Sequence, residues 1–309
     1  MNTAGSDHDK TCLICTPYRL VTTPCLNPSF ANNNMHDILP YTSNHSSSHP
    51  KSHPPRRLSL DSAIAYLKQE PNLTSALFEI ELLLLAFAIG IQDAISFPDF
   101  HCFASNQTGN TVLFAVGLLL DDGDAPLIAI STIAVSLGFF ALGCLVTGQT
   151  ANYFDIRQTR GWFLFTSVVQ TALVYVAAGL QWRYDSIVGP DTMMGRILVD
   201  LLAFSSGSQV AVVRGLKVTD ITTAMATAAY IDIFIDGKLF AKLSENRGRN
   251  RRVLFLFMLV AGSFVGAGVG KKTNLGGAVL VSAVVKTLVA VMFLFNADER
   301  SMSEDKMVE

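Results

Sequence analysis

Eight apolar runs follow one another after residue 75, and each is close to the length of a helix that crosses a lipid bilayer. Such a helix needs roughly 20 predominantly apolar residues. The first, second, fifth and sixth runs are short or contain polar residues, so each is expected to be either a full span or a broken or re-entrant helix. The runs predict an all-α integral membrane protein, a bundle of about six to eight transmembrane segments. They cover residues 77–97, 104–120, 126–149, 161–181, 194–213, 219–236, 253–270 and 275–296.

Composition divides the chain into a polar tail and a membrane domain. Only 16% of the residues are charged, below the roughly 25% that is typical of soluble domains. Residues 1–72 are rich in Ser, Thr, Asn, His and Pro, so we expect a disordered tail, in which Leu60–Lys68 forms a short amphipathic helix on the membrane. The membrane domain is predicted to cover residues 73–298, and a C-terminal tail residues 299–309.

The chain shows no signature of an enzyme or of a metal centre. Its five cysteines are scattered and odd in number, which argues against a disulfide framework. Cys12 and Cys15, with four tail histidines, could be read as a metal site, but no second ligand pair has a recognisable spacing, so a low-complexity tail is favoured. We expect no enzymatic activity, no metal and no cofactor. The net charge of −2 gives no reason to expect a nucleic-acid partner.

Lysines and arginines in the connections predict the orientation, because cytoplasmic loops carry an excess of both. With eight spans, twelve basic residues near the membrane lie on the side of the two termini and six on the other side. Both termini are therefore expected in the cytosol, and the membrane involved is left open. The six are Arg157, Arg160, Arg214, Lys217, Lys271 and Lys272, and the twelve include Arg183 and Arg196.

Two polar stretches, Gly90–Ser96 and Asn106–Thr111, interrupt the apolar pattern. Carboxylates and amides at membrane depth are expensive unless they face a cavity, a partner or a ligand. We interpret them as the wall of a substrate site, and the alternative is that they cap helix ends and pack. The candidate binding residues are Gln92, Asp93, Asn106, Gln107, Thr108, Asn110, Gln209 and Thr227.

The two halves of the membrane domain resemble each other. Gly90-Ile-Gln-Asp-Ala94 matches Gly207-Ser-Gln-Val-Ala211, and Val168–Thr171 matches Val284–Thr287, all at offsets of 116 to 119 residues. This common offset predicts two tandem four-helix repeats, residues 77–181 and 194–296. Four spans per repeat would give both copies the same orientation, with an axis along the membrane normal.

Lys286 lies in the middle of the last apolar run, with about ten residues on either side, so it cannot easily extend to the membrane surface. The repeat pairs it with Gln170, and Asp232 is the predicted counter-charge. These three residues are interpreted as a proton-coupling element, and the alternative is a buried structural pair. Elsewhere, Gly262, Gly266 and Gly270 predict close packing of helices through small residues.

Three motifs of the chain resemble the YoaK family of uncharacterised multi-pass membrane proteins. They are Gly90-x-Gln-Asp-Ala-Ile-Ser-Phe97, Asn106-Gln-Thr-Gly-Asn-Thr111 and Gly207-x-Gln-x-Ala211. The long polar tail resembles that of its fungal members. This likeness extends over residues 77–297 and implies the fold, together with a transporter-like role for a small molecule. Thr227-Ala228 departs from the Thr-Gly that is frequent in the family's second copy.

We therefore expect a secondary transporter or permease of a small polar solute. The solute would lie between the repeats, in contact with Asp93, Gln107, Thr108, Asn110 and Gln209. The alternative is a membrane scaffold or assembly factor that transports nothing and acts through its tail. The expected partners are the lipid bilayer and an unknown small molecule, and formation of a homo-oligomer is left open.

Overall fold

The computed structural model describes residues 60–120, 128–184, 187–216, 221 and 223–296. The chain divides into two units, residues 1–56 and 57–309, and every described residue belongs to the second. Most of the predicted tail of residues 1–72 and the whole of 299–309 lie outside the described residues. Within the predicted tail, Leu60–Lys68 forms helix α1, as expected.

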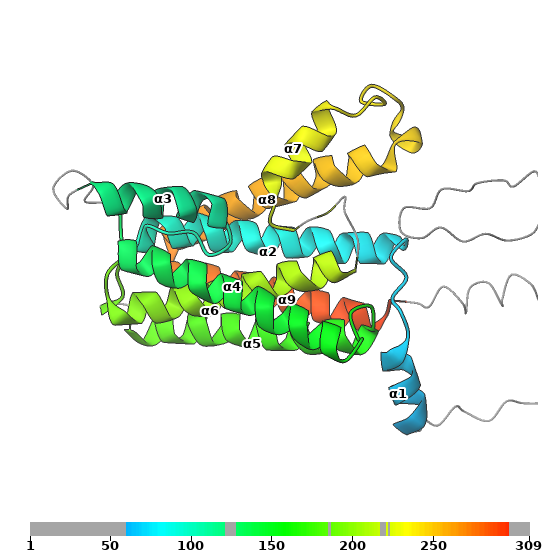
Figure 1. Cartoon of the computed structure of the whole chain (residues 1–309), viewed down its shortest axis with the longest axis horizontal. Coiled ribbons are helices and arrows are strands. Elements are labelled where there is room, and N and C mark those ends of the chain that lie inside the picture. Colours follow the sequence, from blue (N-terminus) through cyan, green and yellow to red (C-terminus); the bar gives the residue numbers. More distant parts are fainter. Residues whose placement is uncertain (1–59, 121–127, 185–186, 217–220, 222, 297–309) are drawn as a thin grey trace, which may run out of the picture. The chain divides into compact units, whose positions relative to one another are not determined.

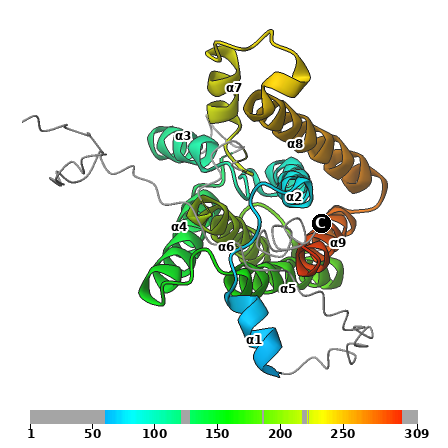
Figure 2. The same ribbon diagram turned by 90° about the vertical axis from the view of Figure 1, so that its right-hand side faces the viewer.

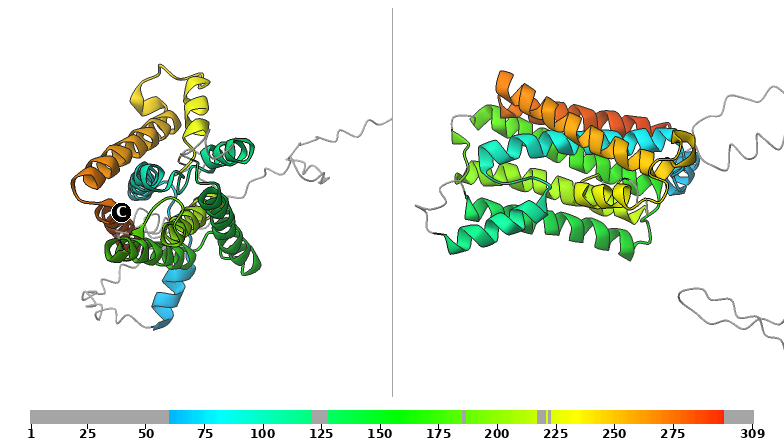
Figure 3. Two further views of the ribbon diagram at one scale, coloured as in Figure 1. Left: turned by 90° about the vertical axis from the view of Figure 1, so that its left-hand side faces the viewer. Right: turned by 90° about the horizontal axis from the view of Figure 1, so that it is seen from above.

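The described part of the chain is helical and contains no strand (Figure 1). Six helices are long and apolar enough to cross a membrane, so the chain is built as a multi-pass helical membrane protein with six candidate spans. This number is the lower end of the predicted range. The six are α2 (Ala76–Phe100), α4 (Ile130–Tyr153), α5 (Arg160–Tyr184), α6 (Met193–Gly215), α8 (Arg247–Lys272) and α9 (Leu275–Leu294), and their axes are roughly aligned, up or down one common axis (Figure 3).

Two short helices, α3 (Gln107–Leu119) and α7 (Ala226–Phe234), stand where the second and sixth spans were predicted. With 13 and 9 residues they are about 20 and 14 Å long, less than the roughly 30 Å of a hydrocarbon core. For these two runs the broken-helix alternative is correct. For the first and fifth runs it is wrong, since α2 and α6 are continuous helices of 25 and 23 residues.

Apart from α1 and a 3-10 helix at Leu243–Glu245, the described helices form two sets of four, α2–α5 and α6–α9, each in the order long, short, long, long. The first helices of the two sets run antiparallel. Ser206 of α6 donates a hydrogen bond to Gln92 of α2, whereas Gln209, further along α6, donates to the carbonyl of Leu85, which is earlier on α2. Residue numbers along the contact therefore rise in one helix and fall in the other.

The last helices of the two sets, α5 and α9, are antiparallel as well. The ring of Phe163, early in α5, stacks on that of Phe293, late in α9. Gln181, late in α5, lies beside Gly276, early in α9. The predicted common orientation of the halves is therefore wrong. Each set contains three full-length helices and one short one, and an odd number of crossings reverses the direction of the second set.

Glycines bring helices from different sets into backbone contact. A Cβ atom added at any of four glycines would lie 2.1 to 2.4 Å from a carbonyl oxygen of the neighbouring helix. Two of these contacts join α2 to α8 and two join α4 to α6, and Figure 2 shows both pairs end-on. Only glycine permits so close an approach. The contacts are Gly90 with Leu259, Gly262 with Phe87, Gly143 with Phe204 and Gly207 with Phe140.

Six crossings instead of eight change the sides on which the basic residues lie. Arg157, Arg160 and Arg214 belong to the end where α2 begins, and Arg183 and Arg196 to the opposite end, which corrects the sequence-based assignment. The basic excess is thereby concentrated further at one end. In the described residues that end also carries Lys68, Lys238, Lys242, Arg247, Arg249, Arg251 and Arg252, whereas the opposite end has only Lys271 and Lys272 besides the two arginines.

Candidate functional site

Asp93, near the end of α2, fixes the loop that leads to α3. Its carboxylate accepts hydrogen bonds from the backbone N–H of Ser105, at 2.7 Å, and from the hydroxyl of the same residue, at 2.5 Å. Ser105 is buried. Hydrogen bonds that a carboxylate accepts from an N–H or a hydroxyl are among the stronger ones in proteins. The predicted binding carboxylate is therefore engaged within its own loop.

Asn110, in the first turns of α3, holds the same loop from the other side. Its side-chain oxygen accepts from the N–H of Phe103 at 2.9 Å, and its nitrogen donates to the carbonyl of Phe103 at 2.8 Å. The nitrogen also donates to Gln107, at 2.9 Å. Asn110 is fully buried, so these bonds satisfy backbone groups that water does not reach. Its local role is to clip the loop to α3.

The other residues of this loop cluster face their own helix or the surface. Asn106 is the N-cap of α3 and accepts from the N–H of Gly109 at 3.2 Å. Gln107 donates to the carbonyl of Ala104 at 3.3 Å, and Thr108 is exposed. In the second set of helices Thr227, in the first turn of α7, is exposed too. The amides thus serve as the caps and packing groups of the alternative interpretation.

Gln209 does not join the loop cluster. Its nitrogen donates to the carbonyl of Leu85 at 3.5 Å, and Leu85 precedes Asp93 by eight residues, about 12 Å along a helix. The predicted gathering of Asp93 and Asn110 with Gln209 is therefore wrong. Helix α2 carries Asp93 toward one end of the bundle, whereas Gln209 faces the middle of α2.

The centre of the bundle contains Lys286, of which only 2% is exposed. Its ammonium group donates to the side-chain oxygen of Gln209 at 2.6 Å, and to Gln170 and Ser205 at 3.4 Å each. All three acceptors are neutral, and they come from α5 and α6. Gln170 and Lys286 thus meet, as the alignment of the two halves predicts.

The predicted pairing of Lys286 with Asp232 is wrong. The Asp232 carboxylate lies 3.7 Å from Arg252 of α8, and its side chain is 45% exposed. Helix α7 is short and packs on the outer part of α8, so Asp232 does not reach the core. Asp236, just after α7, accepts from the side chain of Asn246 and from the backbone of Lys238, which lowers the pKa of Asp236.

A second group of polar side chains lies beside the lysine. Gln92 donates to the hydroxyl of Ser282 at 2.8 Å and accepts from that of Ser206 at 3.3 Å, and all three residues are fully buried. Sequence reasoning identified Gln92 but missed the serines. The signal available was the cluster Ser205, Ser206 and Ser208 in the middle of an apolar run. The polar residues of α2, α5, α6 and α9 therefore meet in one buried core.

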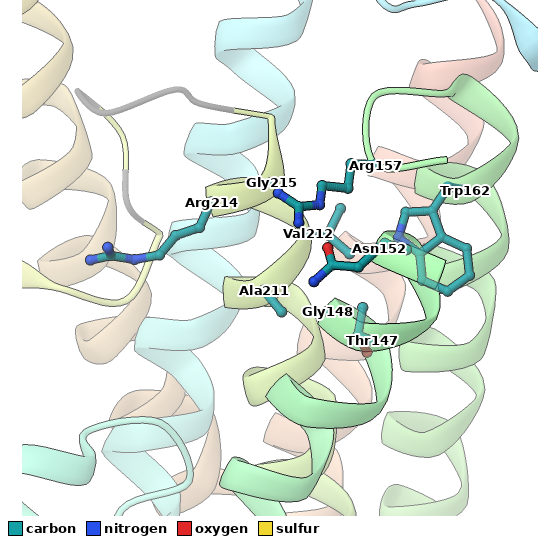
Figure 4. A pocket seen from close by; sticks show the side chains of 10 residues that line it. Thr147, Gly148, Asn152, Arg157, Trp162, Ala211, Val212, Arg214 and Gly215 are labelled. Carbon is teal, nitrogen blue, oxygen red and sulfur yellow. The ribbon is translucent and has the colours of Figure 1, made fainter. Parts of the chain in front are cut away.

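One pocket, of about 320 Å³, opens at the end of the bundle where α4 and α6 end and α5 begins (Figure 4). Its wall includes Thr147, Asn152, Arg157, Trp162 and Arg214. We call it the basic pocket. None of the residues that line it was among the candidate binding residues.

Another pocket, of about 410 Å³, lies at the opposite end, where α2 and α5 end and α9 begins. Pro98, Asp99, Gln181, Gly270 and Asn274 contribute to its wall. We call it the acidic pocket. The two pockets therefore open at opposite ends of the six candidate spans.

A chain of hydrogen bonds leads from the basic pocket to Lys286. The hydroxyl of Thr147, in the pocket wall, donates to that of Ser208 at 2.8 Å. Gln170 donates to the same Ser208 oxygen at 3.2 Å, and Lys286 donates to Gln170. Three side chains thus link the pocket wall to the buried ammonium group.

The described residues contain no cluster of three or more His, Cys, Asp or Glu side chains placed to hold a metal ion. A family described as "Protein of unknown function (DUF1275)" matches residues 82–292, a segment that begins in α2 and ends in α9. No curated protein and no solved structure matches the chain. The match covers well over half of the 309 residues, and the chain therefore belongs to the DUF1275 family.

Proposed function

We propose that this chain is a secondary transporter of a small polar solute, and that Lys286 is the centre of its site. One observation carries the proposal. A buried cation, bonded only to neutral groups in the described part of the chain, lies between two pockets at opposite ends of a membrane bundle. A solute that crosses the bundle would enter one pocket, pass the lysine and leave by the other.

The energetics favour a functional role for this lysine. An ammonium group in the apolar interior costs several kcal/mol unless a counter-charge compensates for it, and the three partners of Lys286 are neutral. Ionisable residues inside membrane bundles generally mark substrate or ion pathways for this reason. Contact with a solute, or exchange of a proton with it, would make use of a charge that contributes little to folding.

We further propose that α2–α5 and α6–α9 form an inverted repeat, the arrangement of many secondary transporters. The matching glycine contacts support it, because α2 crosses α8 as α6 crosses α4. Contact between Gln170 and Lys286, 116 residues apart, supports it too. For two halves related by an axis in the membrane plane, equivalent residues at the axis lie at mid-depth, where a transport site is expected.

The positions of the two pockets agree with the proposed inverted repeat. Gly270 of the acidic pocket follows Ala151 of the basic pocket by 119 residues, and Gly215 of the basic pocket follows Pro98 of the acidic pocket by 117. These offsets agree with the 116 to 119 residues between the matching motifs. In this proposal the pockets are equivalent vestibules that open in turn as the glycine-linked pair of α2 and α8 moves against the pair of α4 and α6.

The experiment is uptake by vesicles reconstituted with the full chain, with radiolabelled amino acids, sugars, nucleosides, carboxylates, phosphate and sulfate as probes. At least one should enter faster than into protein-free vesicles, and Lys286→Met should slow its entry by roughly tenfold or more. Lys272→Gln, at the exposed end of α8, is the matched control and should transport normally. If no probe enters, or if Lys286→Met transports normally, the proposal is overturned.

The finer resemblance to YoaK proteins of the fungal type belongs to this proposal and is supported by the motifs at Gly90 and Asn106. The cytosolic location of both termini is also part of this proposal, and it is supported by the excess of basic residues at the end where α2 begins. The scaffold alternative rested on the tail, most of which lies outside the described residues, and no contact of the described helices favours it.

A further inference from the structure

We infer that the basic pocket binds a small oxyanion, a carboxylate, phosphate or sulfate, and that this is the substrate class. The second part of the inference rests on the proposed function. A volume of about 320 Å³ is near the lower end of small-molecule sites, which suits a ligand of this size.

Arg157 supplies the positive charge of the pocket. Its guanidinium lies beside the amide of Asn152 in Figure 4, whereas the side chain of Arg214 points away from the other lining residues. Arg157 makes no hydrogen bond or ion pair with any residue that the structure describes. Its planar fork of N–H donors is therefore available, and this geometry matches the oxygens of carboxylates and phosphates.

The neutral groups around Arg157 also suit an anion. The indole of Trp162 closes one side of the pocket and carries an N–H that can only donate, and Asn152 adds an amide (Figure 4). No carboxylate is among the described residues that line this pocket. A cationic solute would find a guanidinium here and no compensating charge.

The hydrogen bonds that connect the basic pocket to the core also favour a negatively charged ligand. From the pocket wall, Thr147, Ser208 and Gln170 lead to the ammonium group of Lys286, which is also positively charged. The opposite pocket has a carboxylate, Asp99, in its wall. An oxyanion is thus attracted both at the basic pocket and at the centre.

The sequence provides a reporter, because Trp162 and Trp182 are its only tryptophans. Trp182, near the end of α5, is 62% exposed, so Trp182→Phe leaves Trp162 as the single tryptophan, which can be excited selectively, without disturbing the core. Phosphate, sulfate and oxalate are titrated into this variant at an ionic strength held constant with sodium chloride. Choline and glycerol are the cationic and neutral comparisons.

At least one oxyanion should change the emission of Trp162 saturably, and choline and glycerol should not. Arg157→Gln should weaken the apparent affinity about tenfold, the loss expected when one charged partner is removed. Arg183→Gln, at the opposite end of α5, is the matched control and should leave the affinity unchanged. The absence of a saturable response to all three oxyanions, or equal affinities with and without Arg157, overturns the inference.

Uptake by vesicles distinguishes failure of the oxyanion inference from failure of the transporter proposal. Uptake of a neutral or cationic solute without oxyanion binding would overturn the inference and leave the transporter proposal standing. Oxyanion binding without uptake of any solute would overturn the transporter proposal, and with it the substrate class, and leave only the binding site.

Discussion

The loop cluster around Asp93 and the core around Lys286 are both polar groups among apolar helices, yet their hydrogen bonds differ in kind. Asn110 and Asp93 bond to backbone groups of Phe103 and Ser105, close to them in the chain. Lys286 bonds only to side chains, on two other helices. Bonds to the backbone fix the path of a loop, whereas bonds between side chains of different helices can exchange when those helices move. The first group therefore holds a loop in place, and the second is the group that we propose as the transport site.

The largest loss of stability is expected from Asn110→Ala. It leaves the N–H of Phe103 without a partner, while the carbonyl of Phe103 keeps the bond from the hydroxyl of Ser136, and this should cost about 1–3 kcal/mol. Asn106→Ala, which removes only an exposed helix cap, should cost about 1 kcal/mol. Unfolding of the two purified variants in detergent measures the difference. Equal stabilities would show that the clip on Phe103 is not structural.

Asp93→Asn should have an intermediate effect, about 1–2 kcal/mol, because the side chain keeps its size but loses the charge that strengthens its bonds to Ser105. Uptake per folded molecule should be unchanged. If the variant is as stable as the unmodified protein but no longer transports, Asp93 belongs to the substrate site, and the two groups do not differ in role.

Lys286→Met should change stability by no more than about 1 kcal/mol in either direction, since removing the cost of a buried charge is offset by leaving the side-chain oxygen of Gln209 without its donor. Unfolding is measured on the preparation used for uptake. If the variant is strongly destabilised and its folded fraction still transports, Lys286 is a structural residue and the two clusters do not differ in role.

The smallest effects are expected from Thr108→Val and Thr227→Val. Both threonines are exposed in the first turn of a short helix, so each change should stay within about 0.5 kcal/mol and leave uptake unaltered. Slower uptake by either variant, at unchanged stability, would show that the short helices take part in the site.

The helical membrane fold was predictable because run length and apolar composition determine which segments can span a bilayer. The number of membrane crossings was harder to predict. Runs 104–120 and 219–236 contain enough residues for a span, but the helices within them, α3 and α7, begin at Gln107 and Ala226 and are short. Each miscounted crossing reverses the orientation of every helix after it. The orientation of the second half and the sides of Arg157 and Arg183 were therefore wrong together.

Parts of the site were predictable for a similar reason. Lys286 stands out as a charge in the middle of an apolar run, and the offset between the halves led to Gln170. Asp232 was a reasonable counter-charge by composition, and only the position of α7 on the outside of α8 excludes it. Serines 205, 206 and 282 escaped notice because a small hydroxyl in an apolar helix is equally typical of close packing.

The glycine contacts restrict how such a molecule can change shape. Helices that touch through bare backbone cannot slide along each other without forcing a larger side chain into the crossing, so α2 with α8, and α4 with α6, must each travel as a stiff couple. Each couple takes one member from either half of the sequence. The bodies that shift against one another are consequently mixed in origin, and neither corresponds to a continuous stretch of the chain.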